Sequence, residues 1–424
     1  DMLERKEPDI KNIKSGSILI EENKDLITQS IEIVKNLNNS YLTIQGPPGT
    51  GKTYTSAKII IELMKVGKKV GITSNSHEAI KTLLIAIEQQ AVDQNYEFSG
   101  MRKSKSSDKH EWKFIRNVTT GKPLNMDSYS LFAGTSWFFV DPRMNKTLDY
   151  LFIDEAGQVA LGTTIANATS ADNLVLIGDQ MQLSQPMRAK HEGYARKSSL
   201  DFILEDDDTI STDKGVFLNV TRRLNKKICN YISTSFYDSR LTSDPITETR
   251  SVNLKLDPIK DEGLFYVPID HSGCSQRSDE EADLVEKVFN KIVNKQYKSE
   301  NITGKISAKD IMVVAPYNAQ ANNIRERLKK KFKDDVRVGT IDLFQGQEAK
   351  VVLISMTTSD VESLPRHKDF FFSRNRLNVA ISRAECVAII IFNENLLLAS
   401  ANSIKEMKLM NSFCKLLKFK TNYK

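Results

Sequence analysis

Residues 41–53 read YLTIQGPPGTGKT, and this stretch decides the fold of the N-terminal half of the chain. A short β-branched and aromatic run leads directly into the pattern G-x-x-x-x-G-K-T, which begins at Gly46 and ends at Thr53. The next residues have the apolar spacing of a helix. A strand, a glycine-rich loop and a helix in this order predict a phosphate-binding loop on an α/β sheet.

The loop residues also predict how a nucleoside triphosphate is held. Glycines let backbone amides approach phosphates at a helix N-terminus. Lys52 is expected to reach the β- and γ-phosphates, and the Thr53 hydroxyl to bind Mg²⁺. The predicted phosphate contacts are Gly46, Pro47, Pro48, Gly49, Thr50, Gly51, Lys52 and Thr53.

Outward from this loop, short apolar runs alternate with helical patterns from about residue 41 to 180, and a second series occupies 264–392. Such alternation predicts βαβ units with buried parallel sheets. The chain is therefore expected to hold two α/β domains, at 25–210 and 211–424, after an N-terminal lead-in of residues 1–24.

Two polar stretches interrupt these patterns. The segment EDDDTISTDKG, residues 205–215, breaks both periodicities, and the division between the domains is placed there. Residues 91–130 are polar, lysine-rich and short of apolar repeats. They are predicted to form a basic insertion in the first domain.

Composition limits the function only loosely. Of 424 residues, 40% are hydrophobic and 27% charged, which is ordinary for a globular protein. The net charge of +6 favours a polyanionic partner without identifying one. The basic runs at 101–105 and 329–331 are expected to be solvated surfaces.

Targeting and redox signals are also weak. The longest apolar stretches, such as Cys386–Phe392, are far shorter than the roughly 20 residues that span a bilayer, so no membrane segment is expected. The N-terminus lacks the order of a signal peptide, and a start at Asp1 suggests a piece of something longer. The four cysteines form no CxxC pair, which indicates neither a zinc site nor disulfides and predicts a cytoplasmic protein.

A paired carboxylate follows another predicted strand. Asp154 and Glu155 come directly after the run LFI, where Asp154 is expected to hold Mg²⁺ through water and Glu155 to orient or deprotonate the attacking water. The next strand ends in GDQMQL, which places Asp179 and Gln182 at the same carboxyl edge of the sheet. Gln182 is predicted to sense the γ-phosphate.

Taken together, six segments closely resemble the motifs of superfamily 1 helicases, in the order that the family has them. They are GPPGTGKT (46–53), DEAGQ (154–158), GDQMQL (178–183), VVAPYNAQ (313–320), VGTIDLFQGQEAKVVLIS (338–355) and RNRLNVAISRAE (374–385). The likeness covers about residues 20–395 and is strongest to the B-type branch that holds the nonsense-mediated-decay helicase. It implies two tandem RecA-like domains with ATP in the cleft between them.

A narrower likeness is to the helicase half of bacterial proteins that join a RecB-like nuclease to this motor. It rests on FAGTSWFF (132–139), DYLFIDEAGQ (149–158) and FLNVTRRLNKKICNYIS (217–233). The carboxylate and lysine pattern of such a nuclease is not recognisable in the chain, nor is the accessory β-barrel of many relatives. A nuclease domain or subunit is expected upstream.

The resemblance assigns residues around the base and ribose. It implies that Gln29 reads the adenine edge, although a surface glutamine on a helix is the alternative, and that Glu348 meets the ribose. Where many relatives have Gln-Tyr-Arg, this chain has Thr221-Arg222-Arg223. The stacking tyrosine is therefore missing, and Arg222 is expected to stack instead.

The resemblance also assigns arginines to the γ-phosphate. Arg223 and Arg383 match the two arginine fingers of the family, which stabilise charge in the transition state. Arg376 is expected to be a structural support within the last motif.

For nucleic acid, the segment SNSHEAI (74–80) matches the motif that binds the strand backbone. Trp137 is expected either to stack on a base or to lie in the core beside Phe138 and Phe139. His77 stands where relatives often have asparagine. The implied strand contacts are Ser76, His77, Thr135, Trp137, Tyr317 and Thr340.

The resemblance implies an ATP-dependent helicase that moves 5′ to 3′ on single strands, on DNA rather than RNA. One alternative is a nucleic-acid-stimulated translocase that does not unwind. Another is a slow nucleotide-dependent binding switch, against which Glu155 and the two arginines argue. A small-molecule kinase would leave the last three motifs unexplained.

Overall fold

The computed structural model describes residues 1–104, 110–119, 126–184, 192–300, 302–360, 371–401 and 403–423. By its internal contacts the chain divides into two compact units. The first consists of residues 1–180 and 184–218, and the second of residues 181–183 and 219–424. Both are α/β.

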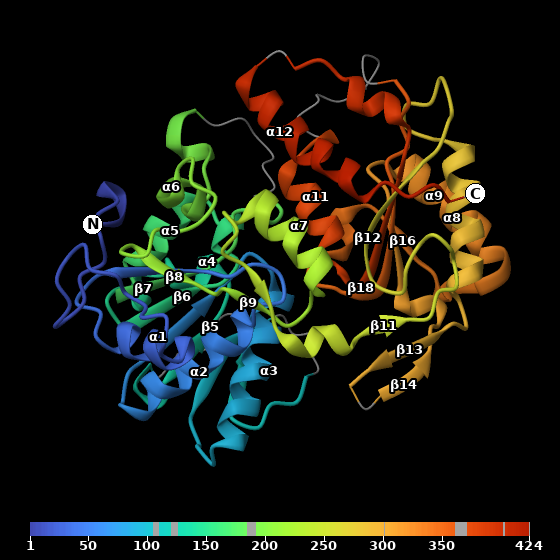
Figure 1. Ribbon diagram of the computed structural model, residues 1–424. Helices are drawn as coiled ribbons and strands as arrows, with labels where there is room; N and C mark the ends of the chain where they lie inside the picture. The colour runs from blue at the N-terminus through green and yellow to red at the C-terminus, as the bar shows by residue number, and fades with distance from the viewer. Residues whose placement is uncertain are drawn as a thin grey trace. The chain divides into compact units, whose positions relative to one another are not determined.

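The first unit is built on an eight-stranded sheet (Figure 1). Its strands are β1 (Tyr41–Gln45), β2 (Val70–Thr73), β3 (Gly100–Lys103), β4 (Ile115–Val118), β5 (Leu131–Ala133), β6 (Leu148–Ile153), β7 (Ala171–Gly178) and β8 (Gly215–Phe217). Its helices are α1 (Leu26–Lys35), α2 (Lys52–Lys65), α3 (His77–Asp93), α4 (Ser136–Phe139), α5 (Leu161–Ala168) and α6 (Ser199–Leu204). The strand order is β4-β3-β5-β2-β6-β7-β1-β8, and every pairing is parallel.

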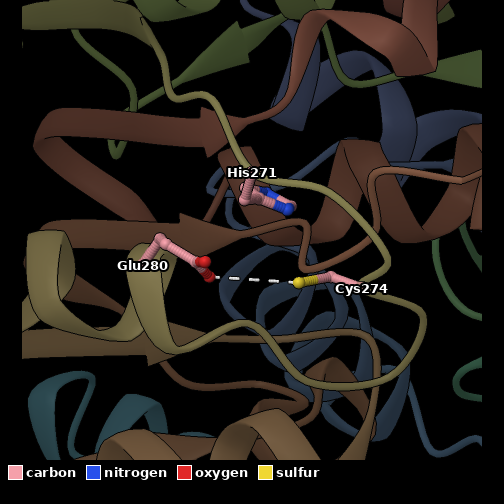
Figure 2. A group of neighbouring side chains, drawn as sticks. All are labelled: His271, Cys274 and Glu280. Atoms are coloured by element: carbon pink, nitrogen blue, oxygen red, sulfur yellow. Dashed lines mark hydrogen bonds between the residues drawn. The ribbon is translucent and has the colours of Figure 1, made fainter.

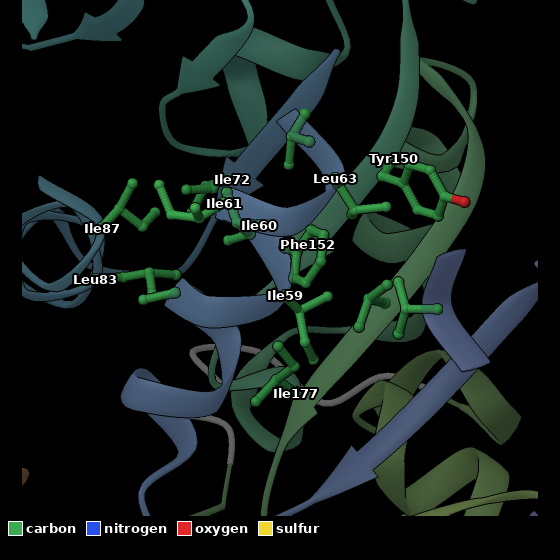
Figure 3. Packing of buried hydrophobic residues seen from close by; sticks show 14 of the residues in the cluster. Ile59, Ile60, Ile61, Leu63, Ile72, Leu83, Ile87, Tyr150, Phe152 and Ile177 are labelled. Carbon is green, nitrogen blue, oxygen red and sulfur yellow. The ribbon is translucent and has the colours of Figure 1, made fainter. Parts of the chain in front are cut away.

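Alternate residues of the central strands bury one face of this sheet. Phe152 of β6 and Ile177 of β7 belong to the same cluster as Ile59 of α2 and Leu83 of α3 (Figure 3). Their side chains are at most 1% exposed. Because side chains alternate along a strand, this register leaves the other residues of β6 and β7 for the opposite face.

Three predicted boundaries need correction. The division near residue 210 is too early, because β8 pairs with β1 and completes the first sheet. The predicted insertion at 91–130 includes β3 and β4, which pair in the same sheet, so part of it belongs to the fold. The lead-in is also packed on this unit, since Ile10 lies in its core and Leu19 donates a backbone hydrogen bond to Thr212.

The second unit is built on a five-stranded parallel sheet in the order β12-β18-β17-β15-β16. Its strands are β9 (Val220–Thr221), β10 (Thr242–Ser243), β11 (Ser251–Val252), β12 (Gly263–Pro268), β13 (Gln296–Ser299), β14 (Ile302–Lys305), β15 (Ile311–Val314), β16 (Arg337–Gly339), β17 (Ala349–Ser355) and β18 (Ala384–Phe392). Its helices are α7 (Lys226–Phe236), α8 (Asp279–Ile292), α9 (Asn318–Phe332), α11 (Arg374–Ile381) and α12 (Ile404–Cys414). Strands β11, β13 and β14 form a separate antiparallel sheet.

The core of the second unit repeats the logic of the first. Phe289 of α8 and Ile324 of α9 pack in one cluster with Val313 of β15, Leu353 of β17 and Ile389 of β18. All five side chains are fully buried. The prediction of two α/β domains with parallel sheets is thereby confirmed.

Five strands of each sheet have the same order. In the first unit these five strands lie across the sheet in the order β1-β7-β6-β2-β5. In the second unit they lie in the order β12-β18-β17-β15-β16. If the five strands of each unit are numbered one to five along the chain, both orders read one, five, four, two, three. The two sheets can therefore be compared strand by strand.

Among the helices that the structure describes, none combines the length and the apolar character needed to cross a membrane.

Candidate nucleotide and nucleic-acid sites

The predicted phosphate loop joins β1 to α2. Lys52 is the first residue of α2, and its Nζ donates to the carbonyl oxygen of Gly46 at 2.6 Å. A Cβ at residue 46 would overlap the Lys52 side chain, so the loop closes around the lysine only because Gly46 lacks one. Gly49 and Gly51 adopt φ of 75° and 81°, which glycine reaches without steric cost.

The start of α2 fits an anion. Gly51 is the N-cap and has no side chain to cap the helix, so the first amides of α2 are left for a ligand. Within the loop, the Thr50 hydroxyl donates to the Pro47 carbonyl oxygen at 2.8 Å and fixes the turn. Thr53 lies in the first turn of α2, as the magnesium assignment requires.

The paired carboxylate lies at the end of β6, two strands from β1. Burial raises the pKa of Asp154 and the charge of Glu155 raises it further, whereas Lys52 lowers it. The charge of the loop lysine therefore acts on this carboxylate. A cation held between Asp154 and the Thr53 hydroxyl would relieve the unfavourable burial of negative charge, so these residues fit Mg²⁺.

The turn after Glu155 packs tightly on the end of β7. A Cβ at Gly157 would lie 2.9 Å from the Asp179 carbonyl oxygen, and one at Gly178 would lie 2.9 Å from the Ala156 nitrogen. Asp179 is 2% exposed. Glycines at 157 and 178 are therefore required to bring the two strand ends together.

Gln182 is placed differently from the carboxylates. Residues 181–183 belong by their contacts to the second unit. There, Asn375 donates to the Gln182 carbonyl oxygen, and Asn378 donates to that of Met181 at 2.8 Å. The γ-phosphate role of Gln182 stays a prediction.

Gln29 of α1 holds the loop that precedes this helix. Its Oε1 accepts from the Glu21 amide at 2.8 Å, and its Nε2 donates to the carbonyl oxygens of Glu21 and Lys24 at 3.0 and 3.1 Å. Reading an adenine edge would require some of these bonds to be exchanged. The structure gives Gln29 a structural role and leaves the base contact a prediction.

Two predicted nucleotide residues of the second unit form an ion pair. Arg223 donates from Nε to a carboxylate oxygen of Glu348 at 2.7 Å. The side chain of its neighbour Arg222 is 60% exposed and pairs with Asp244 at 3.2 Å, and its stacking on a base stays a prediction. Arg223 lies two residues after β9 (Val220–Thr221), in the second unit.

Two of the three arginines of the last motif, Arg376 and Arg383, are held by their own unit. Arg383 is 2% exposed, and it donates to the carbonyl oxygens of Val379 and Gln347 at 3.3 and 2.9 Å. Arg376 donates through both terminal nitrogens to Asp342, at 2.9 and 3.2 Å. This bidentate pair fits the structural role expected of Arg376.

Three predicted nucleic-acid residues of the first unit line one cavity of about 660 Å³. They are His77 at the start of α3, Thr135 before α4 and Trp137 within α4. The Trp137 side chain is 83% exposed, whereas Phe138 and Phe139 are buried. The core alternative for Trp137 is therefore wrong, and its ring is available to a ligand.

Sequence reasoning did not single out two other residues of this cavity. Asn75 lies in the motif SNSHEAI, and Thr163 lies in α5. The Asn75 amide donates to the Gln158 carbonyl oxygen, and Gln158 Nε2 lies 3.5 Å from a Glu155 carboxylate oxygen. The motif already contained Asn75, but only the fold shows that it connects the cavity to the carboxylate.

The remaining residues that were predicted to contact the nucleic-acid strand have mainly structural partners. The Ser76 hydroxyl caps α3 by accepting from the Ala79 amide at 3.0 Å. Tyr317 is the N-cap of α9 and is 5% exposed, and Thr340 precedes the turn at Ile341–Phe344. Ser76, Tyr317 and Thr340 follow β2, β15 and β16, so all three lie at carboxyl ends of parallel strands.

A phosphate loop followed by paired carboxylates on a parallel sheet, with a second sheet of the same order, defines a P-loop nucleoside triphosphatase with two RecA-like domains. Comparison with known proteins agrees with this class. Residues 29–187 match one family model described as an AAA domain, and residues 198–395 match a second with the same description.

Known relatives are similar over most of this chain. The DNA polymerase alpha-associated DNA helicase A of Schizosaccharomyces pombe is 24% identical, over 83% of this chain and 61% of its own length. The DNA replication ATP-dependent helicase/nuclease DNA2 of Saccharomyces cerevisiae is 26% identical, over 89% of this chain and 26% of its own. The regulator of nonsense transcripts 1 homolog of Neurospora crassa is 26% identical, over 87% and 37%.

These matches, with the motifs in order, show that the chain is similar to the motor of superfamily 1 helicases over most of its length. The chain spans less than two thirds of the length of each relative named above.

Proposed function

We propose that this chain moves along single-stranded nucleic acid at the expense of ATP, and separates strands as it moves. The observation that carries the proposal is the cavity of the first unit, where an exposed Trp137 stands beside His77 and Thr135. Exposed aromatic rings of this kind stack on bases without regard to sequence.

The cavity and the phosphate loop share one edge of one sheet. The cavity residues follow β2 and β5, while the phosphate loop and Glu155 follow β1 and β6. All these strands are parallel, and β6 lies beside β2. Ligands of such sheets bind at the carboxyl ends of the strands, so both sites have the placement that their functions require.

In the proposed mechanism the first unit binds ATP and prepares the attacking water. The loop amides and Lys52 hold the phosphates, Thr53 and Asp154 hold Mg²⁺, and Glu155 orients or deprotonates the water. Bound Mg²⁺ would neutralise charge on the β- and γ-phosphates. These roles rest on the loop geometry, on the raised pKa of Asp154 and on the family motifs.

The second unit supplies positive charge in this proposal. Arg223 and Arg383 act as fingers on the γ-phosphate, with Gln182 as a sensor. Glu348 meets the ribose, while Arg222 and Gln29 contact the base. Because Arg223 pairs with Glu348, and Arg383 with backbone carbonyls, both must exchange partners when they engage the nucleotide.

Hydrogen bonds offer a route by which nucleic acid stimulates hydrolysis. Asn75 lines the cavity and donates to Gln158, whose side chain lies beside the Glu155 carboxylate. A strand that moves Asn75 would shift Gln158 and so the orientation of Glu155. We infer that an occupied cavity positions Glu155 for catalysis.

The kind of nucleic acid that is bound and the direction of movement along it are proposed from the relatives. One of the three relatives named above is a DNA helicase by name and another is a DNA replication helicase/nuclease, which supports DNA as the strand. The B-type likeness supports 5′-to-3′ movement. The likeness to bacterial nuclease fusions, and a nuclease acting beside this motor, remain part of the proposal; the helicase/nuclease named above supports such a pairing.

The decisive experiment is steady-state ATP hydrolysis by the chain and by Glu155→Gln, each alone, with single-stranded DNA and with single-stranded RNA. Strong stimulation by one polymer is expected, and Glu155→Gln should lower the stimulated rate by about 10²–10⁴-fold. The control is Asp172→Asn, an exposed acid at the amino end of β7, far along the strand from the site. Equal, unstimulated rates would instead support the slow binding switch.

Strand separation is tested with duplexes that carry a 5′ or a 3′ single-stranded tail. Release from the 5′-tailed duplex alone supports the helicase and its direction. Stimulated hydrolysis without release from either duplex would leave a translocase that does not unwind.

A further inference from the structure

Three side chains of the second unit, two in the loop between β12 and α8 and one in the first turn of α8, bring a nitrogen, a sulfur and an oxygen together. His271, Cys274 and Glu280 each offer one ligand atom, and these atoms lie within 4.8 Å of one another (Figure 2). The Cys274 Sγ lies 3.9 Å from a Glu280 carboxylate oxygen. None of the three belongs to the predicted nucleotide or nucleic-acid sites.

The imidazole of His271 is held in one orientation. Its side chain is fully buried, and Nε2 lies 3.0 Å from Glu281 Oε1. The other oxygen of Glu281 accepts from the Ser355 hydroxyl at 2.5 Å and from the Thr357 amide at 2.8 Å. Glu281 is thus a fixed carboxylate that sets the tautomer of the ring, as outer partners of metal-binding histidines do.

This arrangement leaves one ring nitrogen over. His271 Nδ1 is buried and has no hydrogen-bond partner among the described residues. A buried polar atom without a partner is destabilising, so such atoms are rare and call for a ligand. With Nε2 engaged by Glu281, Nδ1 is the nitrogen that a ligand can use.

The loop that carries Cys274 is also fixed. The Cys274 amide donates to the Ser359 hydroxyl at 3.1 Å, and its carbonyl oxygen accepts from the Ser359 amide and the Thr358 hydroxyl, both at 3.0 Å. The local field is negative, because the carboxylates of Glu280, Glu281 and Asp279 all act on Cys274. A rigid loop in a negative field favours a cation.

We propose that His271, Cys274 and Glu280 bind a divalent cation of the zinc type. Imidazole, thiolate and carboxylate together select Zn²⁺ over the hard cations Mg²⁺ and Ca²⁺, which prefer oxygen ligands. The thiol gives its proton to solvent as the Cys274 thiolate bonds to the metal. Three protein ligands leave a fourth coordination place for water, and the bound ion would tie the β12–α8 loop to the start of α8.

The first test uses Co²⁺ as a spectroscopic stand-in for Zn²⁺ on the full chain, freed of metal with a chelator. One equivalent of Co²⁺ should produce a thiolate-to-cobalt charge-transfer band, which Zn²⁺ should then displace. Cys274→Ser should abolish the band, whereas Cys414→Ser, at another partly exposed free cysteine, should retain it. A band that survives in Cys274→Ser, or no band in the parent chain, overturns the proposal.

The second test does not depend on the cysteine. Glu280 is exposed at the surface of α8, so Glu280→Gln is expected to fold, and its affinity for Zn²⁺ in calorimetric titration should fall at least tenfold. The matched control is Glu286→Gln on the same helix, with unchanged affinity. If Glu280 only stabilises the first turn of α8, Glu280→Gln will lower Tm with no change in Zn²⁺ affinity, and the proposal fails.

Discussion

The two units share a strand order but differ in the connection that leaves the first strand. After β1, residues 46–51 form a glycine-rich loop around Lys52. After β12, the equivalent connection carries His271 and Cys274 and leads to the acidic start of α8. The same framework thus presents a phosphate loop in one sheet and a candidate cation site in the other.

A similar contrast is seen after the fourth of the five shared strands along the chain, which is β6 in the first unit and β17 in the second. Glu155 and Thr357 each lie two residues beyond that strand, and both have positive φ, of 54° and 73°. In the first unit this place holds the carboxylate expected to act on water. In the second, the Thr357 amide donates to Glu281, so the equivalent turn supports the His271 cluster. A shared backbone geometry therefore serves chemistry in one unit and structure in the other.

The largest expected effect tests whether the second unit takes part in hydrolysis at all. Arg223→Ala should lower the single-turnover rate of hydrolysis at saturating ATP by about 10³-fold, because a finger stabilises charge only in the transition state. The adjacent exposed Arg222→Ala, expected to contact the base, should raise KM and leave kcat nearly unchanged. A rate within threefold of the parent for Arg223→Ala would confine the chemistry to the first unit.

The fold was predictable because its signals are local. Apolar runs such as 151–153 and 386–392, each followed by a loop residue, indicated buried parallel strands, and both proved to be buried. The phosphate loop was equally predictable from the sequence, since its glycines are required by backbone geometry. Strands β3 and β4 were missed, because their polar composition resembles a loop. Only pairing makes them strands: β3 pairs with β5, and the edge strand β4 pairs with β3.

The sites were less predictable, because burial and partners depend on the fold. Trp137 and Phe138 are neighbours in sequence, yet one is exposed and the other buried. A search for paired cysteines could not find the His271 cluster, whose ligands are of three kinds. The spacing H-x-x-C-x-x-x-x-x-E was the available signal, and it becomes meaningful only when Glu281 fixes the ring.

A smaller effect tests the close packing of strand ends in the first unit. Gly157→Ala would bring a Cβ to 2.9 Å from the Asp179 carbonyl oxygen, and should lower the free energy of unfolding by about 1–3 kcal/mol. Gly162→Ala, in α5 with open space around it, should instead be neutral or stabilise by about 0.4–1 kcal/mol. Denaturant titration measures the free energy of unfolding of both variants. Equal free energies for Gly157→Ala and Gly162→Ala would show that residues 156–157 shift readily to accommodate the added Cβ.

The smallest effect compares the strand contacts of the two units. Trp137→Ala should weaken binding of single-stranded DNA by about 1 kcal/mol, roughly fivefold in Kd, the lower end of the range for stacking because the ring is so exposed. Trp137→Phe should recover part of this loss of affinity. The control is Tyr194→Ala, which removes an exposed aromatic ring outside the cavity and should leave the affinity unchanged. Fluorescence anisotropy with a labelled strand measures each.

Thr340→Val provides the counterpart in the second unit, since Thr340 follows β16 as Thr135 follows β5. Loss of one hydroxyl contact should cost about 0.5–1.5 kcal/mol if Thr340 binds the strand backbone. Losses of similar size for Trp137→Ala and Thr340→Val would mean that both units bind the same single-stranded DNA at the ends of equivalent β-strands. A loss confined to Trp137→Ala would mean that the first unit alone holds the strand in the absence of nucleotide.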